Sequence, residues 1–233
     1  MTVLAFESSA APASVCLCRD GKICAYAYQN SGLTHSKTLL PMADFVLSSA
    51  GVKPTEVDVF ALAAGPGSFT GLRIGAGTVK GLCWSVSKPC ATVSTLLAMA
   101  HLHTEWGGIV CPAMDARRSQ VYTAAFDVSN GSVERILPDC ALSAGEMCDW
   151  ISSSKKPVLL VGDGAQLLYD FASERGICCT LAPEETRYQN AAGVAAAALG
   201  HETVSADELK LNYLRLSQAE RERNARENGE EIK

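Results

Sequence analysis

Residues 57–86, VDVFALAAGPGSFTGLRIGAGTVKGLCWSV, combine a mostly apolar run, a glycine-proline-glycine break and a long proline-free stretch. The run at 57–64 predicts a buried strand, because a short apolar segment bounded by turn residues is typical of one. The break at 65–67 predicts a tight turn, and residues 70–86 are predicted to form a helix after it. This order of strand, turn and helix favours an α/β protein.

The flanking segments continue the alternation. Strands are predicted at residues 2–6, 14–18, 23–28 and 91–93. Asp20 and Gly21 predict a hairpin between the second and third of these strands. A helix is predicted at 36–50; Pro41 suggests that its regular part begins there, and Gly51 is expected to end it. A further helix, capped by Ser94 or Thr95, is expected to end near His103.

The second half of the chain shows a similar order of elements. Strands are predicted at residues 109–114, 120–126, 133–137, 158–161 and 177–180. Helices are predicted at residues 143–151, 166–172 and 191–199. Two copies of one order suggest a duplicated α/β fold of the ribonuclease H-like or actin-like (ASKHA) type, with two lobes that each hold a mixed sheet and flanking helices. The expected lobes are residues 1–104 and 105–218, followed by a charged, frayed or disordered tail at 219–233.

The composition of the chain limits the classes of function that it can have. The 233 residues are 48% hydrophobic and carry a formal net charge of -5, which disfavours RNA binding by this chain alone. Ten cysteines without a C-x-x-C pair, and no leader before the first strand, favour a reduced cytoplasmic setting. The apolar stretch at 193–199 is too short to span a membrane.

Histidine spacing argues against a metalloenzyme. Leu39 stands four residues after His35, so a helical His-x-x-x-His pair is absent there. His101 and His103 would diverge on the predicted helix, and no Ser/His/Asp or Cys/His arrangement is recognisable. We therefore reject a protease. The glycines around Asp163 fit either a nucleotide-contacting turn or a plain strand–helix turn.

Five segments together resemble the TsaB (YeaZ) family. They are residues 4–9 (LAFESS), 35–41 (HSKTLLP), 65–75 (GPGSFTGLRIG), 115–122 (DARRSQVY) and 213–215 (YLR). The resemblance spans about residues 2–216, and the long glycine-rich string is its most specific part. Glu7 stands where the family has Asp, which puts a metal or phosphate role of that loop in doubt. Asn212 stands where Pro often precedes the Tyr.

The resemblance implies a non-catalytic subunit in tRNA modification. A TsaD-like catalytic subunit would transfer a threonylcarbamoyl group to N6 of adenosine 37, and a TsaE-like ATPase would join the assembly. The chain would form a homodimer when alone, would meet tRNA only indirectly and would not bind a membrane. It would require no cofactor of its own, with ATP as a candidate ligand at the interface of the complex. Two alternatives remain: an actin-like nucleotide-binding enzyme, either ATPase or kinase, and a homodimer without a dedicated partner.

Two predicted helices are candidates for the interface. The helix at 36–50 is apolar nearly all round, and the helix at 70–86 contains four glycines, each costing about 1 kcal/mol relative to alanine. The residues alone favour packing on the chain's own sheet and partner binding equally, and the resemblance favours the partner. Expected partner-binding residues are Leu39, Met42, Ala43, Val46, Gly71, Arg73, Ile74, Gly75, Thr78 and Lys80. Candidate nucleotide or loop contacts are Glu7, Ser8, Gly65, Pro66, Gly67 and Ser68. Val46→Glu is expected to abolish complex formation without unfolding the protein.

Overall fold

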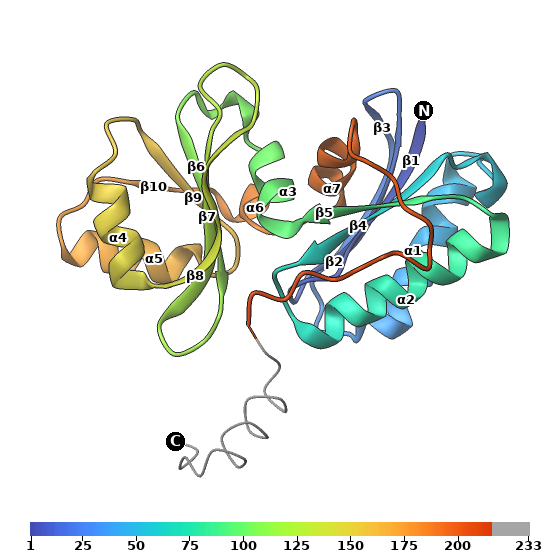
Figure 1. Ribbon diagram of the computed structural model, residues 1–233, viewed down its shortest axis with the longest axis horizontal. Helices are drawn as coiled ribbons and strands as arrows, with labels where there is room; N and C mark the ends of the chain where they lie inside the picture. Colours follow the sequence, from blue (N-terminus) through green and yellow to red (C-terminus); the bar gives the residue numbers. More distant parts are fainter. Residues whose placement is uncertain (216–233) are drawn as a thin grey trace, which may run out of the picture.

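Two five-stranded sheets organise residues 1–215, the part of the chain that the computed structural model describes (Figure 1). Each sheet lies in its own lobe, and the lobes stand side by side. The tail predicted at residues 219–233 lies outside the described residues. In residues 1–215, no helix combines the length and the apolar character needed to cross a membrane.

The first sheet has the order β3-β2-β1-β4-β5. Its strands are β1 (Thr2–Glu7), β2 (Ala13–Arg19), β3 (Lys22–Gln29), β4 (Val59–Gly65) and β5 (Cys90–Ser94). The first three strands form an antiparallel meander, and β4 and β5 extend it in parallel with β1. Asp20 and Gly21 have φ of 51° and 79° at the turn between β2 and β3, so the predicted hairpin is confirmed.

Alternating side chains of β1 build a core on each face of this sheet. Leu4 and Phe6 point to the face covered by α1 (His35–Ser49) and α2 (Phe69–Val86). Val3 and Ala5 point to the other face, which α7 (Ala191–Ala198) covers. That second core is rich in alanine, so α7 lies close to the strands.

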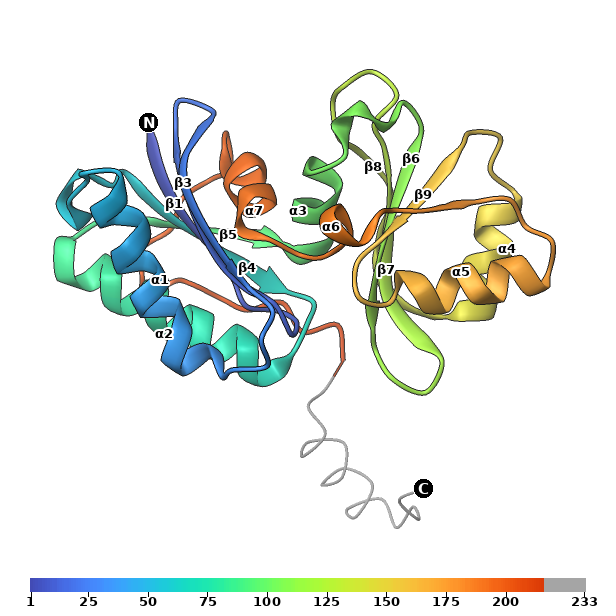
Figure 2. The same cartoon turned by 180° about the vertical axis from the view of Figure 1, so that it is seen from behind.

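The second sheet repeats the arrangement in the order β8-β7-β6-β9-β10. Its strands are β6 (Ile109–Asp115), β7 (Gln120–Asp127), β8 (Glu134–Ser143), β9 (Val158–Val161) and β10 (Thr180–Leu181). The antiparallel and parallel pairs recur in the same places, which confirms the predicted duplicated fold. Helices α4 (Ala144–Ser152) and α5 (Ala165–Glu174) pack on one face, while α3 (Thr95–His101) packs on the other, between the two lobes (Figure 2).

Some element boundaries differ from the predictions. Helix α1 begins at His35, and Pro41 lies inside it rather than at its start. Pro41 is exposed, and so is Lys37, whose carbonyl loses its helical partner, so water can replace the missing bond. Strand β8 is longer than predicted and β10 is shorter. Three short helices were not predicted: η1 (Pro54–Glu56), η2 (Thr104–Trp106) and α6 (Glu184–Arg187).

The end of the chain returns to the first lobe. Helix α7 packs on β1 and β2, and Val204 pairs with Cys90 at the start of β5. Ala206 and Leu209 are buried in the core beneath α1 and α2. The division of the chain near residue 104 stays a prediction, and residues 191–215 contribute to the first lobe as well as to the connection between the lobes.

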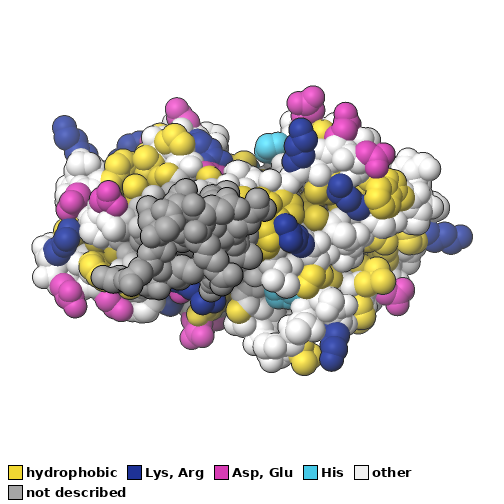
Figure 3. All heavy atoms as spheres, turned by 60° about the horizontal axis from the view of Figure 1, so that its bottom comes forward, with side chains coloured by type: hydrophobic (Ala, Val, Ile, Leu, Met, Phe, Trp, Pro, Cys, Tyr) yellow, Lys and Arg dark blue, Asp and Glu magenta, His cyan; other side chains and the backbone are white. Residues whose placement is uncertain are grey.

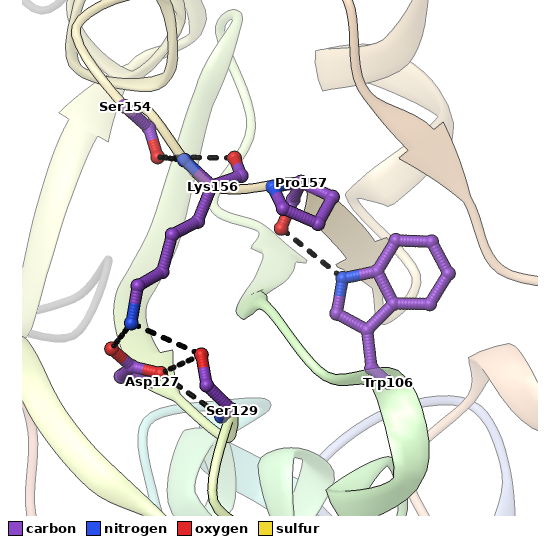
Figure 4. A network of polar contacts seen from close by, with 6 residues as sticks. All are labelled: Trp106, Asp127, Ser129, Ser154, Lys156 and Pro157. Atoms are coloured by element: carbon purple, nitrogen blue, oxygen red, sulfur yellow. Dashed lines mark hydrogen bonds and ion pairs between the residues drawn. The ribbon is translucent and has the colours of Figure 1, made fainter.

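A network of hydrogen bonds and one ion pair lies in the second lobe, where β7 ends and β9 begins (Figure 4). Lys156 Nζ pairs with Asp127 Oδ2 at 2.5 Å and lies 3.0 Å from Ser129 Oγ. Hydrogen bonds from Lys156 and Ser129 lower the pKa of Asp127 to about 2. Nearby, Trp106 Nε1 donates to the carbonyl of Pro157 at 3.2 Å. These contacts join the strand ends and have a structural role.

Candidate functional site

A cleft of about 770 Å³ separates the two lobes. From the first lobe it is lined by Ser9 after β1 and by the turn that leads into α2. From the second lobe, Asp115, Arg117 and Asp163 reach it from the ends of β6 and β9. Residues 212–215 cross its floor. The cleft therefore gathers four of the five segments that carry the family resemblance, together with His35 from the fifth.

The glycine-rich turn packs directly against the loop after β1. Ser68 caps α2 by accepting a hydrogen bond from the Gly71 N–H at 3.3 Å, and its own N–H donates to the Ser9 carbonyl at 2.6 Å. A Cβ at Gly67 would lie 2.5 Å from the same carbonyl oxygen. The predicted loop residues Gly67 and Ser68 thus both contact Ser9, and close backbone packing accounts for the glycine.

Two glycines of α2 serve the same internal packing. A Cβ at Gly71 would lie 2.0 Å from the Ser8 carbonyl oxygen, and one at Gly75 would lie 2.4 Å from Ser8 Oγ. Ser8 Oγ also donates to the Gly71 carbonyl at 3.0 Å. Gly77 and Gly81 differ, because a Cβ at either position would have no neighbour within 4 Å among the described residues. The four helix glycines therefore divide into an inner and an outer pair.

These glycines provide a test of the packing. We expect Gly71→Ala to lower the free energy of unfolding by about 3 kcal/mol, because backbone atoms must move to admit the methyl group. Gly77→Ala should raise it by about 1 kcal/mol through helix propensity. Urea unfolding curves of the two variants measure the difference. Equal effects at both positions would contradict the inner and outer assignment.

The C-terminal segment ties the lobes together beneath the cleft. Gly65, with φ of 123°, lets the chain pass so closely that a Cβ there would lie 2.1 Å from the Asn212 carbonyl oxygen. The Asn212 N–H donates a hydrogen bond to the Ala64 carbonyl oxygen at 2.7 Å. Arg215 then donates to the carbonyl of Ala116 in the second lobe at 3.1 Å. This crossing gives residues 213–215 a structural role, and the close approach at Gly65 permits it.

An aromatic cluster marks the start of α2. The ring of Tyr213 lies 4.6 Å from that of Phe69 between centroids, and the guanidinium of Arg73 lies 3.9 Å from the Phe69 centroid. Arg73 Nε also donates to the Tyr213 hydroxyl at 3.4 Å. The segment at 212–215 is therefore joined to α2 as well as to the second lobe.

Glu7 is fully buried at the end of β1. Its Oε1 accepts a hydrogen bond from the Ser9 N–H at 2.6 Å, while Oε2 has no partner among the described residues. Burial raises the pKa of Glu7 to about 7, and Asp163 adds a like charge. Burial also raises the pKa of Asp163, although a hydrogen bond from Gln189 Nε2 at 2.6 Å opposes this shift. A carboxyl group that ionises near neutrality therefore lies next to the cleft.

The histidines considered as metal ligands, and the glycine turn around Asp163, are held by contacts within the protein. His35 Nε2 lies 2.8 Å from the Ala10 carbonyl oxygen and joins α1 to the loop after β1. His103 Nε2 lies 3.0 Å from the Thr186 carbonyl oxygen. Residues 1–215 contain no group of three or more His, Cys, Asp or Glu side chains placed to hold a metal. A Cβ at Gly162 would lie 2.1 Å from the Ala113 carbonyl oxygen, so close packing accounts for that glycine.

The orientation of the two helices corrects part of the expected interface. Five of its residues are buried against the protein's own core: Leu39, Ala43, Val46, Gly71 and Gly75. They offer no surface to a partner, so the expectation for Val46→Glu is wrong, because a carboxylate there would enter the core. The other five expected residues are at least partly exposed: Met42, Arg73, Ile74, Thr78 and Lys80.

Large hydrophobic side chains on the outside of these helices were missed. Leu40, Phe45 and Trp84 are 55%, 62% and 59% exposed. Together with Gly77 and Gly81 they form what we name the outer α1–α2 face. Figure 3 shows hydrophobic side chains gathered over the lobe that carries these helices, on the right of that view. No local pattern in the sequence distinguishes these exposed side chains from the buried ones beside them on the same helices.

Comparisons with known proteins agree with the fold and the shared segments. The family model of TsaD, tRNA N6-adenosine threonylcarbamoyltransferase, matches residues 29–221. The chain is 31% identical to the tRNA threonylcarbamoyladenosine biosynthesis protein TsaB of Bacillus subtilis, covering 94% of this chain and 96% of that protein. It is also 31% identical to TsaB of Escherichia coli, covering 76% and 78% of the two chains.

Solved structures give the same result. YeaZ from Pseudomonas aeruginosa has a TM-score of 0.76 and 26% identity, and the alignment covers 91% of this chain and 99% of that one. The ethanolamine utilization protein EutJ from Carboxydothermus hydrogenoformans, at 12% identity and a TM-score of 0.53, shares the fold alone. The predicted resemblance is confirmed, and the chain belongs to the TsaB (YeaZ) family of tRNA threonylcarbamoyladenosine biosynthesis proteins.

Proposed function

We propose that this chain is a non-catalytic subunit that binds a TsaD-like threonylcarbamoyltransferase and holds it in its active arrangement. The observation that carries the proposal is the outer α1–α2 face. It exposes Leu40 and Phe45 on α1, and Trp84 and two glycines on the neighbouring α2; a Cβ added at either glycine would meet nothing within 4 Å among the described residues. Exposed large hydrophobic side chains on adjacent helices are typical of a protein-binding surface.

The outer glycines support a helical partner. Each of Gly77 and Gly81 costs the exposed helix about 1 kcal/mol relative to alanine, and neither is required by packing within residues 1–215. Without a Cβ, the backbone of α2 can approach a neighbouring helix closely. We therefore expect helices of the partner to pack along α1 and α2. The same face would close a homodimer when the partner is absent.

The cleft supports a non-catalytic role. The start of α2 is joined to the chain's own loop through Ser68 and Ser9 and through Ser8 and Gly71. The Ser68 N–H and the Ser8 hydroxyl are engaged in these two bonds, which supports an internal packing role for the glycine-rich turn. In this proposal the chain requires no cofactor of its own, ATP binds at the interface of the complex, and the assembly works in the cytoplasm. A TsaE-like ATPase joins it, and tRNA is held through the partners.

Reconstitution tests the proposal. The chain is mixed with TsaD-like and TsaE-like partners, the adenylate-forming enzyme, tRNA and ATP, and N6-threonylcarbamoyladenosine is measured. We expect modification only when the chain is present, and no modification by the chain alone. Equal modification without it would overturn the scaffold role. ATP hydrolysis by the pure chain would instead support a nucleotide-binding enzyme.

A further inference from the structure

The side chain of Arg73 is held in one direction at the start of α2. Its guanidinium carbon lies 3.9 Å from the centroid of the Phe69 ring, and its Nε donates to the Tyr213 hydroxyl at 3.4 Å. The two aromatic rings are themselves in contact, with centroids 4.6 Å apart. Stacking and a hydrogen bond therefore restrict an arginine side chain that would sample many rotamers in the open.

Tyr213 is a firm anchor for this arrangement, because the chain is fixed on both sides of it. The residue before it, Asn212, donates its N–H to the Ala64 carbonyl oxygen of β4 at 2.7 Å. Two residues after it, Arg215 donates to the Ala116 carbonyl oxygen of the second lobe at 3.1 Å. The hydroxyl that holds the arginine is thus part of the connection between the lobes.

The other donors of Arg73 are available on the outer α1–α2 face. Arg73 is exposed, and within residues 1–215 its two Nη groups form no hydrogen bond or ion pair. Gly77 and Gly81 follow it at steps of four residues and are also exposed, so all three lie on one side of α2. A helix that packs closely over the two glycines would therefore pass beside the guanidinium.

We infer that Arg73 binds a carboxylate of the partner protein, carried by an Asp or Glu of the helix that packs over Gly77 and Gly81. The inference rests on the proposed function and names the chemistry that this face recognises. A planar guanidinium can donate two parallel N–H bonds to a carboxylate, which an ammonium group cannot do. Because Phe69 and Tyr213 already restrict the side chain, less rotamer freedom is lost when the ion pair forms.

The surroundings of Arg73 favour a protein carboxylate over an RNA phosphate. Leu40 and Phe45 on α1, and Trp84 on α2, expose large hydrophobic surfaces on the same pair of helices. RNA-binding surfaces are instead broadly basic, and this chain carries a formal net charge of -5. A single arginine among apolar side chains is the composition of a protein interface.

Titration calorimetry with the TsaD-like partner tests the inference. Arg73→Ala should raise the dissociation constant by about 30-fold, and Arg73→Lys should recover only a small part of the loss, because the paired bonds need the planar group. Arg19→Ala removes the same charge from an exposed position at the end of β2 and should bind like the wild type. Circular dichroism checks that each variant is folded.

The outcomes separate the inference from the proposed function. Equal affinities of the wild type and Arg73→Ala would overturn the inference, while the proposed function would stand if Phe45→Glu still abolished binding. Failure of the wild type to bind the partner would overturn both. Loss of tRNA from the assembled complex of Arg73→Ala, at unchanged affinity between the proteins, would assign the guanidinium to a phosphate and overturn the inference.

Carbodiimide coupling identifies the group that meets Arg73. In Arg73→Lys, the introduced amine can form an amide with an adjacent carboxylate, with loss of water, and mass spectrometry of the linked peptides locates both residues. We expect position 73 to be linked to an Asp or Glu of the partner when the complex is saturated. The wild type is the control, because carbodiimide does not couple a guanidinium. A saturated complex without this link would contradict the inference.

Tyr213 is a positioning residue in this inference, because it acts through Arg73. Tyr213→Phe keeps the ring contact with Phe69 and removes the hydroxyl, so it should weaken partner binding by about threefold. The double variant with Arg73→Ala should bind like Arg73→Ala alone, since the hydroxyl has no effect without the guanidinium. Additive losses in the double variant would overturn the positioning role.

Discussion

Phe45→Glu should weaken binding of the TsaD-like partner by at least about 100-fold and leave the fold intact. Phe45 is 62% exposed on α1, so the carboxylate is hydrated in the free protein. In the complex it would be enclosed by apolar groups, and burying an unpaired charge costs several kcal/mol. Each 1.4 kcal/mol corresponds to about tenfold in the dissociation constant. Isothermal titration calorimetry with the purified partner measures the effect, and circular dichroism checks the fold.

The neighbouring residue supplies a sharp contrast. Val46 is fully buried, so Val46→Glu should unfold the first lobe rather than act on the interface alone. Ile23→Glu is the matched surface control, because Ile23 is 57% exposed on the edge strand β3. It should leave both stability and binding unchanged. Normal partner binding by Phe45→Glu would place the interface elsewhere on the molecule.

Glu7→Gln should remove most of the loss of stability that we expect between pH 5 and pH 8. The pKa of Glu7 is raised by burial from 4.5 to about 7, so the folded protein holds this proton more tightly than the unfolded chain. The favourable contribution of Glu7 to the free energy of unfolding is complete below the pKa of the unfolded chain. It is lost as the pH rises through the folded pKa of about 7. The full difference is about 3 kcal/mol at 1.36 kcal/mol per pKa unit.

Urea unfolding at several pH values measures this effect. Glutamine keeps the oxygen that accepts the Ser9 N–H, so the variant should be more stable than the wild type at pH 8 and similar at pH 5. Glu105→Gln, at an exposed position, is the control and should follow the wild type. Parallel pH dependence of Glu7→Gln and the wild type would mean that Glu7 is not the titrating group.

Local patterns were sufficient for most of the fold. Some signals act within a few residues, so each could be recognised in isolation. They are the apolar runs that form the strands, the Asp20-Gly21 turn and the serine cap at Ser94. Repetition of the same order of elements indicated two similar lobes. The short helix α6 was not predicted because a single turn has no hydrophobic periodicity. The start of α1 was predicted too late because Pro41 costs the helix little free energy when the carbonyl that loses its hydrogen bond is exposed to water.

The outward side of α1 and α2 could not be read from the chain. An apolar helix has no polar stripe to mark its surface, so Phe45 and Val46 look equivalent until the sheet covers one of them. The glycines of α2 are likewise alike in sequence. Gly71 and Gly75 are distinguished from Gly77 and Gly81 by their approach to Ser8, which lies more than sixty residues away in the chain.

The sequence by itself determined the order of the elements, the duplication and the family, because these depend on local periodicity and on contiguous motifs. The tertiary structure decided which side chains reach solvent, how deeply Glu7 is buried and how residues 212–215 join the two lobes. These properties arise from contacts between segments far apart in the chain. They depend on packing that no local pattern of residues specifies.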